Sequence, residues 1–393
     1  MTKSYQKIEY SSKHLTLRKV LFVIFILVAL FSFGYAVKNM LEWEAGYRQI
    51  EAEDSYGDEV ELRYYTESKS EYNKVKKIYD SSCKQMYELL DESNLYDDVI
   101  NIAYFNQNIN TKVQVDEKLY KVLEKLASYD NRTIYLGPVY EIYKGIFSCT
   151  EEYQLAEFDP LLNEDINQEL KQLLVYLNSD ENIKINLYDD NYVELYVSDE
   201  YKQYIDEHGY SCYLDLYWIK NSFIIDDVAD SLLAQGYDKG LLSCYNGYYR
   251  FLSSDSVMYH YYDLIDGNIG IIADIDYSQP TACVFYRSYQ MFELDSFINY
   301  TLADGSVRTC YVSNDDGYSK APISSLTVYS EEKDCSTLVL ESMKYYISNE
   351  FDTESIKSED FKYFYVTDNT LNYNDRSLII ENLYTGYQLN YVE

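Results

Sequence analysis

The feature that most constrains this chain is an uncharged apolar run close to its N-terminus. The run spans residues 20–37 and reads VLFVIFILVALFSFGYAV. Wound as an α-helix at 1.5 Å per residue, it would be roughly 27 Å long, about the hydrocarbon thickness of a bilayer. The run therefore predicts a transmembrane helix, and whatever folds behind it is a domain attached to a membrane.

The charges beside the run predict its orientation. Residues 1–19 contain five lysines and arginines and one acid, Glu9. Since basic flanks remain in the cytoplasm, we predict a cytoplasmic tail over 1–19, a stalk over 38–60 and an exported C-terminal domain in a single-pass cell-membrane protein. The alternative is a cleaved signal peptide, because Gly34-Tyr35-Ala36 offers small residues at cleavage spacing.

The charge balance excludes one large class of partner. The chain carries 66 Asp and Glu against 33 Lys and Arg, a formal net charge of −33. Such a field repels nucleic acid, so we predict no binding to DNA or RNA. It permits cationic partners and divalent metals, and it also supports simple solubility.

Residue types with characteristic chemistry are sparse or scattered. The seven cysteines contain no C-x-x-C pair and no metal-ligand cluster, which predicts buried free thiols. There are three histidines, and the glycine-rich phosphate loops and the G-x-S-x-G nucleophile motif are absent from the sequence. Local motifs alone therefore identify no activity.

Periodicity predicts a mixed fold. Apolar residues at helical spacing predict helices over 69–92, 115–129, 163–177, 224–236 and 335–349. Asn163 provides capping chemistry at the start of one helix, and Gly236 a C-terminal cap for another. Alternating segments predict strands, including a hairpin over 183–198 that turns at Asp190-Asn191. Without a βαβ rhythm, these elements indicate an α+β domain.

The order of several segments carries a family resemblance. These segments are DVINIAYFNQN, LGPVYEIYKGIF, YLDLYWIKNSFIIDDVADSLLAQGYDKGLLSCYNG, LADGSVRTCYVSNDDGY and SSLTVYSEEKDCSTLVL. Their succession resembles the FAD:protein FMN transferase (ApbE-like) family over residues 61–350, which leaves 351–393 as a C-terminal extension. The resemblance implies an exported, membrane-attached enzyme that cleaves FAD and attaches FMN to a threonine of a target protein, with Mg²⁺ as cofactor.

The block from Asp215 to Gly247 corresponds to the family's flavin-contacting segment, D-L-G-G-I-A-K-G-Y-A-x-D, followed by a helix and a Gly-Gly turn. By this resemblance Asp215, Asn221 and Gly247 are the cofactor-binding residues. Asn221 stands at the family's lysine, and Tyr217 and Trp218 stand at its paired glycines. Glycines let a nucleotide approach the backbone, so large side chains there alter the approach.

The later blocks correspond to the metal-binding part of the family pattern. Ser336 and Thr337 match the end of A-D-A-x-S-T, which places Lys333 at the metal-binding aspartate and Asp334 one position further along. The resemblance thus implies Asp334 and Thr337 as metal ligands. In the preceding block, Cys310 stands where the family has a histidine.

Two functions are consistent with these matches. The first is a Mg²⁺-dependent FMN transferase that uses FAD. The second is a non-catalytic, extracytoplasmic protein-interaction domain without a cofactor, which binds a flavin-carrying or redox membrane protein. We favour the second because the core-forming positions match the family, whereas the positions that contact flavin and metal are mostly altered. A structural envelope protein with an accidental resemblance is a third, weaker hypothesis.

Overall fold

The computed structural model describes residues 19–26, 28, 32, 43–52, 60–253, 257–277 and 281–393. Residues 19–26 are helical. The predicted cytoplasmic tail before residue 19, half of the predicted anchor and about half of the predicted stalk lie outside the described residues. Within the described ranges, no helix combines the length and apolar character needed to cross a bilayer. The membrane anchor therefore stays a prediction from the sequence.

The chain divides into two compact units. The first comprises the described residues up to Arg48 together with Tyr65–Lys74, and the second comprises Gln49–Tyr64 and Val75–Glu393. In the first unit, the Trp43 ring lies 5.6 Å from the Tyr72 ring. The Arg48 guanidinium lies 4.2 Å from the centre of the Trp43 ring, a cation–π contact. The second unit holds almost all of the regular structure.

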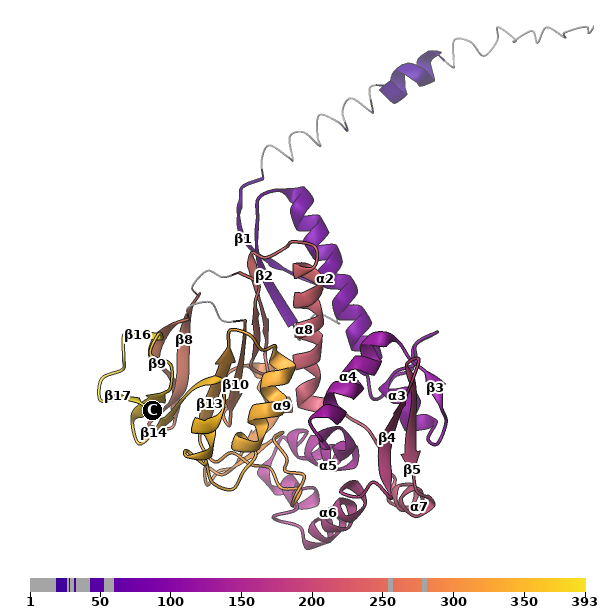
Figure 1. Ribbon diagram of the computed structural model, residues 1–393, viewed down its shortest axis with the longest axis vertical. Coiled ribbons are helices and arrows are strands. Elements are labelled where there is room, and N and C mark those ends of the chain that lie inside the picture. The colour runs from indigo at the N-terminus through magenta and orange to yellow at the C-terminus, as the bar shows by residue number, and fades with distance from the viewer. Residues whose placement is uncertain are drawn as a thin grey trace, which may run out of the picture. The chain divides into compact units, whose positions relative to one another are not determined.

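A nine-stranded sheet forms the centre of the fold (Figure 1). In spatial order its strands are β1 (Gly46–Ile50), β2 (Val60–Thr66), β6 (Gly240–Cys244), β7 (Tyr248–Phe251), β10 (Ala282–Arg287), β13 (Ser325–Ser330), β14 (Lys362–Thr367), β15 (Thr370–Tyr373) and β17 (Gln388–Tyr391). Neighbours from β2 to β15 are antiparallel, and β15 pairs with β17 in parallel. Residues after 351 thus supply three strands of this sheet.

The two faces of the central sheet are covered differently. A small sheet of β16 (Ile379–Glu381), β9 (Asn268–Tyr277) and β8 (Val257–Ile265) packs on one face. Helices α8 (Lys220–Leu233) and α9 (Cys335–Tyr346) contact β6, β7, β10 and β13. Alternation along β10 separates the layers, because successive strand residues point to opposite faces. The Phe285 ring contacts Tyr261 of β8, whereas the Tyr286 hydroxyl hydrogen-bonds Ser342 of α9 at 2.8 Å.

The remaining elements extend the domain beyond this sandwich. The further helices are α2 (Lys69–Leu90), α3 (Ile102–Gln107), α4 (Glu117–Ser128), α5 (Gly137–Phe147), α6 (Glu164–Leu177) and α7 (Asp199–His208). The short sheets contain β3 (Val113–Gln114), β5 (Tyr192–Val197) and β4 (Ile183–Tyr188), and β11 (Asn299–Thr301) with β12 (Val307–Thr309). Single 3₁₀ turns occur at Thr133–Leu136, Glu152–Glu157, Tyr217–Ile219, Glu293–Phe297 and Ser355–Ser358.

These elements confirm the α+β prediction and most of the predicted segments. The Asn163 side chain caps α6 by accepting from the backbone N–H groups of the first turn, and Gly236 adopts φ +79° just after α8. Asp190 and Asn191 both have φ +59°, the two left-handed residues of a tight hairpin turn between β4 and β5. Helix α8 begins four residues before its predicted start. Helices α3, α5 and α7 were not predicted. Strands β1, β3, β8, β11, β12 and β14 to β17 were not predicted either.

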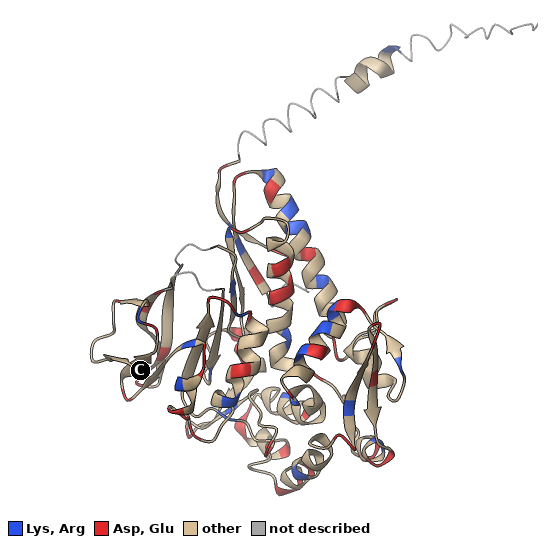
Figure 2. Ribbon diagram, viewed as in Figure 1, with Lys and Arg blue, Asp and Glu red and all other residues tan. Residues whose placement is uncertain are grey.

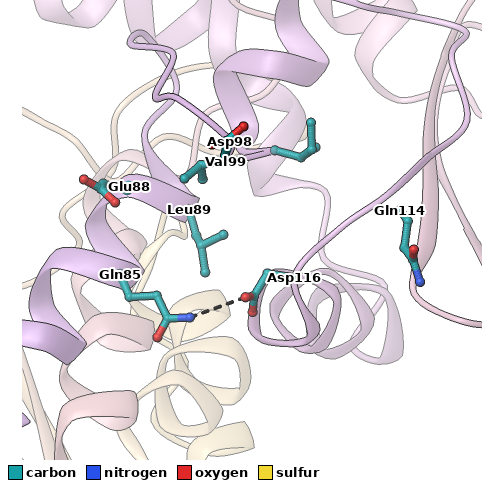
Figure 3. Close-up of a pocket in the computed structure, with 8 residues that line it drawn as sticks. Gln85, Glu88, Leu89, Asp98, Val99, Gln114 and Asp116 are labelled. Carbon is teal, nitrogen blue, oxygen red and sulfur yellow. Dashed lines mark hydrogen bonds between the residues drawn. The ribbon is translucent and has the colours of Figure 1, made fainter. Parts of the chain in front are cut away.

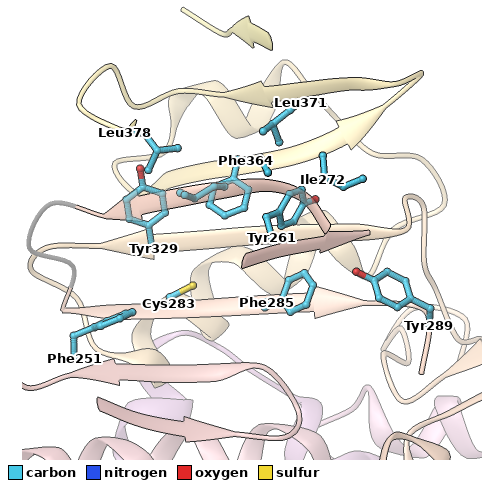
Figure 4. Packing of buried hydrophobic residues seen from close by; sticks show 12 residues of the cluster. Phe251, Tyr261, Ile272, Cys283, Phe285, Tyr289, Tyr329, Phe364, Leu371 and Leu378 are labelled. Atoms are coloured by element: carbon cyan, nitrogen blue, oxygen red, sulfur yellow. The ribbon is translucent and has the colours of Figure 1, made fainter. Parts of the chain in front are cut away.

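All seven cysteines are free, and six of them are buried. The prediction of buried free thiols is therefore confirmed. A cluster of buried hydrophobic residues packs between the two sheets (Figure 4). There the Tyr261 ring meets the Phe364 ring edge-on, with centroids 4.9 Å apart.

We expect Phe364→Ala to destabilise the domain by about 3–5 kcal/mol, because it deletes a fully buried ring from this cluster. The matched control is Phe297→Ala, since that phenylalanine side chain is 62% exposed. We expect its effect to stay within about 0.5 kcal/mol. Urea unfolding of both variants measures the difference, and equal losses at the two positions would contradict the assigned core.

Candidate functional site

A buried carboxylate, that of Asp226, links helices α8 and α9. Asp226 of α8 accepts hydrogen bonds from the backbone N–H of Cys335 at 2.9 Å and of Ser336 at 2.8 Å. It also accepts from the Ser336 hydroxyl at 2.7 Å and lies 3.2 Å from Nε of Arg250 on β7. Asp226 therefore fixes the first turn of α9 to α8 and to the central sheet.

Asp334 caps the same helix end. Its Oδ1 accepts from the backbone N–H of Thr337 at 2.8 Å, the usual N-cap geometry. The ammonium of Lys125, from α4, donates to Oδ1 of Asp334 at 2.7 Å and to Oδ2 at 2.9 Å. The same ammonium donates to Oγ of Ser336 at 2.7 Å. A lysine side chain thus binds the carboxylate that the resemblance marks as a metal ligand.

The pKa values of Asp226 and Asp334 are shifted in opposite directions. Burial, and then the nearby Asp334 carboxylate, raise the pKa of Asp226 to about 6, although Arg250 opposes the rise. Burial alone would also raise the pKa of Asp334. The Lys125 ammonium and the hydrogen bonds from Thr337 outweigh burial there and lower the pKa of Asp334 below its ordinary value.

Magnesium does not fit these residues as they stand. Mg²⁺ requires several free oxygen ligands around it, whereas both Asp334 oxygens are engaged by Lys125. Lys333, which stands at the family's metal-binding aspartate, is ion-paired with Glu341 and Asp360. Among the described residues, no three His, Cys, Asp or Glu side chains are grouped so that they could hold a metal.

Asp215, the predicted flavin contact, is almost completely buried and already bonded. Its Oδ2 accepts from the Lys144 ammonium of α5 at 2.7 Å, and its Oδ1 accepts from the backbone N–H of Tyr217 at 2.6 Å. Burial and the Glu92 carboxylate raise the pKa of Asp215 to about 6, against the influence of Lys144. The carboxylate therefore stabilises the turn that follows it.

The two residues at the family's paired glycines fill space with aromatic rings. Tyr217 keeps a positive φ of +39°, a conformation that favours glycine. Trp218 is buried and meets the Tyr311 ring edge-on at 5.1 Å. The Trp218 carbonyl accepts from Asn246 Nδ2 at 3.0 Å and from the Tyr248 hydroxyl at 2.9 Å. Side chains of the same chain thus satisfy the hydrogen-bonding capacity of the Trp218 carbonyl.

Asn221 and Gly247 lie in the same packed region. Asn221 is buried, its Nδ2 lies 3.5 Å from Oδ1 of Asn246, and its own Oδ1 has no partner among the described residues. Gly247 has φ +96°, and a Cβ added there would lie 2.2 Å from the backbone oxygen of Phe285. Gly247 is therefore required by the close approach of the β6–β7 turn to β10.

The structure thus brings four of the five predicted residues together in two groups, and the fifth, Asp215, is paired with Lys144 instead. Asp334 and Thr337 meet at the cap of α9, and Asn221 and Gly247 flank Asn246 behind Trp218. Sequence reasoning missed two lysines that bind predicted site residues, Lys125 and Lys144. Each lies far along the chain from its aspartate, with 209 positions between Lys125 and Asp334, so neither spacing nor periodicity pointed to it.

Three cavities among the described residues lie outside these groups, and one of about 620 Å³ is lined by Lys333, Glu341 and Asp360 among others. A cavity of about 530 Å³ has aromatic walls, with Glu61, Arg63 and His260 among its lining residues. The rings in its walls are those of Tyr245, Tyr249, Phe251, Tyr259, Tyr262 and Phe292. A smaller cavity of about 280 Å³ is bordered by Gln85 and Asp116, which are hydrogen-bonded at 3.4 Å (Figure 3). None of the five predicted site residues lines any of these cavities.

Comparison with known proteins found similar solved structures but no similar sequences. No protein-family model matches the sequence, and no curated protein sequence matches it. The ApbE protein of Thermotoga maritima superposes with a TM-score of 0.57 at 14% identity, covering 87% of this chain and 98% of that one. The flavin transferase ApbE of Vibrio cholerae gives 0.55 at 13%, covering 83% and 94%.

This chain has the ApbE fold. The resemblance seen in the sequence is thereby confirmed at the level of the fold. Identities of 13–14% do not carry individual residue roles from the ApbE structures to this chain. The five predicted site residues therefore remain predictions, and only their contacts within this chain bear on their roles.

The raised pKa of Asp226 predicts a pH-dependent stability. Because the folded-state pKa is about 6 and the unfolded value is 3.8, the folded state binds the proton more tightly. This group therefore stabilises the fold most below pH 4, and its contribution falls as pH rises to 6, by about 1.4 kcal/mol for each unit of the pKa difference.

Asp226→Asn removes this titration. We expect the stability of the wild type relative to Asp226→Asn to fall between pH 4 and pH 6, as measured by urea unfolding. Asp230→Asn is the control, because Asp230 is an exposed carboxylate 3.1 Å from the same Arg250. A relative stability that rises with pH at Asp226 would contradict the assignment.

We expect Gly247→Ala to destabilise this ApbE fold by about 2–4 kcal/mol, because the new methyl group collides with the Phe285 carbonyl. Gly305→Ala is a matched control, since Gly305 has φ +85° but nothing within 4 Å of the added Cβ. Gly305→Ala should lose only about 1 kcal/mol of stability, the cost of placing a residue with a Cβ at positive φ. Similar midpoints for the two variants in thermal unfolding would show that the close approach is absent.

Proposed function

We propose that this chain is a membrane-anchored, extracytoplasmic domain of the ApbE fold that binds a partner protein and does not transfer FMN. The observation that carries the proposal is the closed turn at Tyr217 and Trp218. Where the family pattern has two glycines, the Trp218 carbonyl is bonded to Asn246 and Tyr248. The Tyr217 ring lies 5.0 Å from the Tyr140 ring, and its hydroxyl donates to the Phe297 carbonyl at 2.7 Å.

The charged residues near this turn support the same conclusion. Phosphoryl transfer depends on cations that neutralise the transferring group and on ligands that hold it in line. Here Asp215 and Asp334, the carboxylates that the resemblance assigns to flavin and metal, each accept from a lysine ammonium at 2.7 Å. Both are therefore occupied by intramolecular ion pairs, and Cys310 supplies only a buried thiol at the histidine position.

Membrane attachment and the choice of partner rest on the sequence. The apolar run over 20–37 and the basic residues before it support a single-pass anchor with the domain outside the cytoplasm. Figure 2 shows acidic residues spread over helices, strands and loops rather than gathered on one element. A partner with a cationic surface fits this charge, and the resemblance favours a flavin-carrying or redox membrane protein.

The retained fold supports a second candidate, the family reaction itself. In that case Mg²⁺ and FAD would bind, and FMN would be transferred to a threonine of a target. The two candidates differ in a direct way, since the first requires no flavin or metal and the second requires both.

Calorimetric titration of FAD into the purified full-length chain, with and without Mg²⁺, separates them. We expect no heat of binding in either condition when FAD is added up to several hundred micromolar. This result would mean that any dissociation constant for FAD is about 1 mM or weaker. The Vibrio cholerae flavin transferase, titrated in the same buffer, is the positive control.

A transfer assay completes the test. The chain is incubated with FAD, Mg²⁺ and a threonine-containing target domain, and covalent flavin is read as in-gel fluorescence. Micromolar, Mg²⁺-dependent binding followed by labelling of the target would reject the non-catalytic function and establish the transferase.

A further inference from the structure

The Lys125 ammonium has an unusually complete set of contacts for a lysine at the edge of a domain. It donates to both carboxylate oxygens of Asp334, at 2.7 and 2.9 Å, and to the Ser336 hydroxyl at 2.7 Å. An ammonium has three N–H donors, so these contacts use its whole hydrogen-bonding capacity.

The oxygens around this ammonium form a set that also suits a hard cation. Carboxylate and hydroxyl oxygens are ligands of Mg²⁺ and Mn²⁺. Behind Ser336 stands a second carboxylate, because the Ser336 hydroxyl donates to Oδ2 of Asp226 at 2.7 Å. The cation bound by these oxygens is the Lys125 ammonium of the same chain.

We propose that Lys125 is the built-in cation of this pocket. Its ammonium takes the position that a divalent cation would otherwise occupy, and shortening the side chain opens a Mg²⁺ or Mn²⁺ site on Asp334 and Ser336, with Asp226 behind them. Because Lys125 is tethered to α4, its ammonium is present at a high effective concentration, and free metal ions compete poorly with it.

The pocket is accessible enough for the exchange. The Lys125 and Asp334 side chains keep 24% and 32% of their surface exposed, so a hydrated ion can reach the carboxylate once the lysine stem is removed. Arg250 remains paired with Asp226 at 3.2 Å, so the second carboxylate stays in place when Lys125 is changed.

The same helix provides a matched control. Lys118 of α4 donates to Oδ2 of Asp227 at 2.8 Å, a lysine–aspartate pair of similar exposure. Within the described part of the chain, the Lys118 ammonium contacts one carboxylate oxygen and no hydroxyl. Removing Lys118 therefore leaves the Asp227 carboxylate without a hydroxyl ligand beside it, whereas removing Lys125 leaves the Asp334 carboxylate, the Ser336 hydroxyl and the Asp226 carboxylate behind it.

Mn²⁺ binding to the full-length chain tests the proposal, with the free ion measured by electron paramagnetic resonance. We expect Lys125→Ala to gain one site that binds Mn²⁺ about tenfold or more tightly than any site of Lys118→Ala or of the wild type. Adding Asp334→Asn to Lys125→Ala should abolish this site. If Lys125→Ala does not fold, Lys125→Ser, which keeps a small polar side chain, takes its place.

Two results would overturn the proposal. One is equal Mn²⁺ binding by the Lys125 and Lys118 variants, which would show that the oxygens around Lys125 bind a metal ion no better than those of an ordinary lysine–aspartate pair. The other is binding by the wild type that Asp334→Asn abolishes, which would show that the lysine yields to metal. No flavin is present in this measurement, so its outcome is separate from that of the FAD titration.

Discussion

The arrangement of the candidate site depends on the buried carboxylate of Asp226. It accepts from two backbone N–H groups in the first turn of α9, where the helix dipole also favours negative charge. This junction contains two buried N–H groups, and leaving either one without its acceptor would cost about 1–3 kcal/mol. It determines where Ser336 and Asp334 lie, and hence where the ammonium of Lys125 is bound.

Much of the fold could be predicted because many elements carry their signals locally. Helix α6 has both an apolar stripe and the Asn163 cap, and the β4–β5 hairpin has Asp190 and Asn191 at its turn. Helix α5 was missed because eight of its eleven residues are buried, so it lacks the polar face that reveals a helix. Strand β8 was missed because tyrosines and polar residues follow one another in VMYHYYDLI without clear alternation.

The candidate site could be predicted only where it is local in sequence. Asp334 and Thr337 lie within one helical turn, so their capping contact follows from spacing alone. The partners that decide the chemistry come from elsewhere, Lys125 from α4 and Lys144 from α5. In a chain with twice as many acids as bases, each lysine has many candidate carboxylates. Only the packing of the helices selects among them.

Tyr217 has φ +39°, a backbone conformation that suits glycine better than tyrosine. A non-glycine residue at positive φ costs on the order of 1–3 kcal/mol, so other contacts must offset that cost. Its backbone N–H donates to Asp215, its hydroxyl to the Phe297 carbonyl, and the Lys144 ammonium lies 5.0 Å from its ring. Two of these three contacts come from Asp215 and Lys144, which are themselves paired at 2.7 Å. The contacts that offset the cost of this backbone conformation are therefore the same ones that pack the Tyr217 side chain against the rest of the domain.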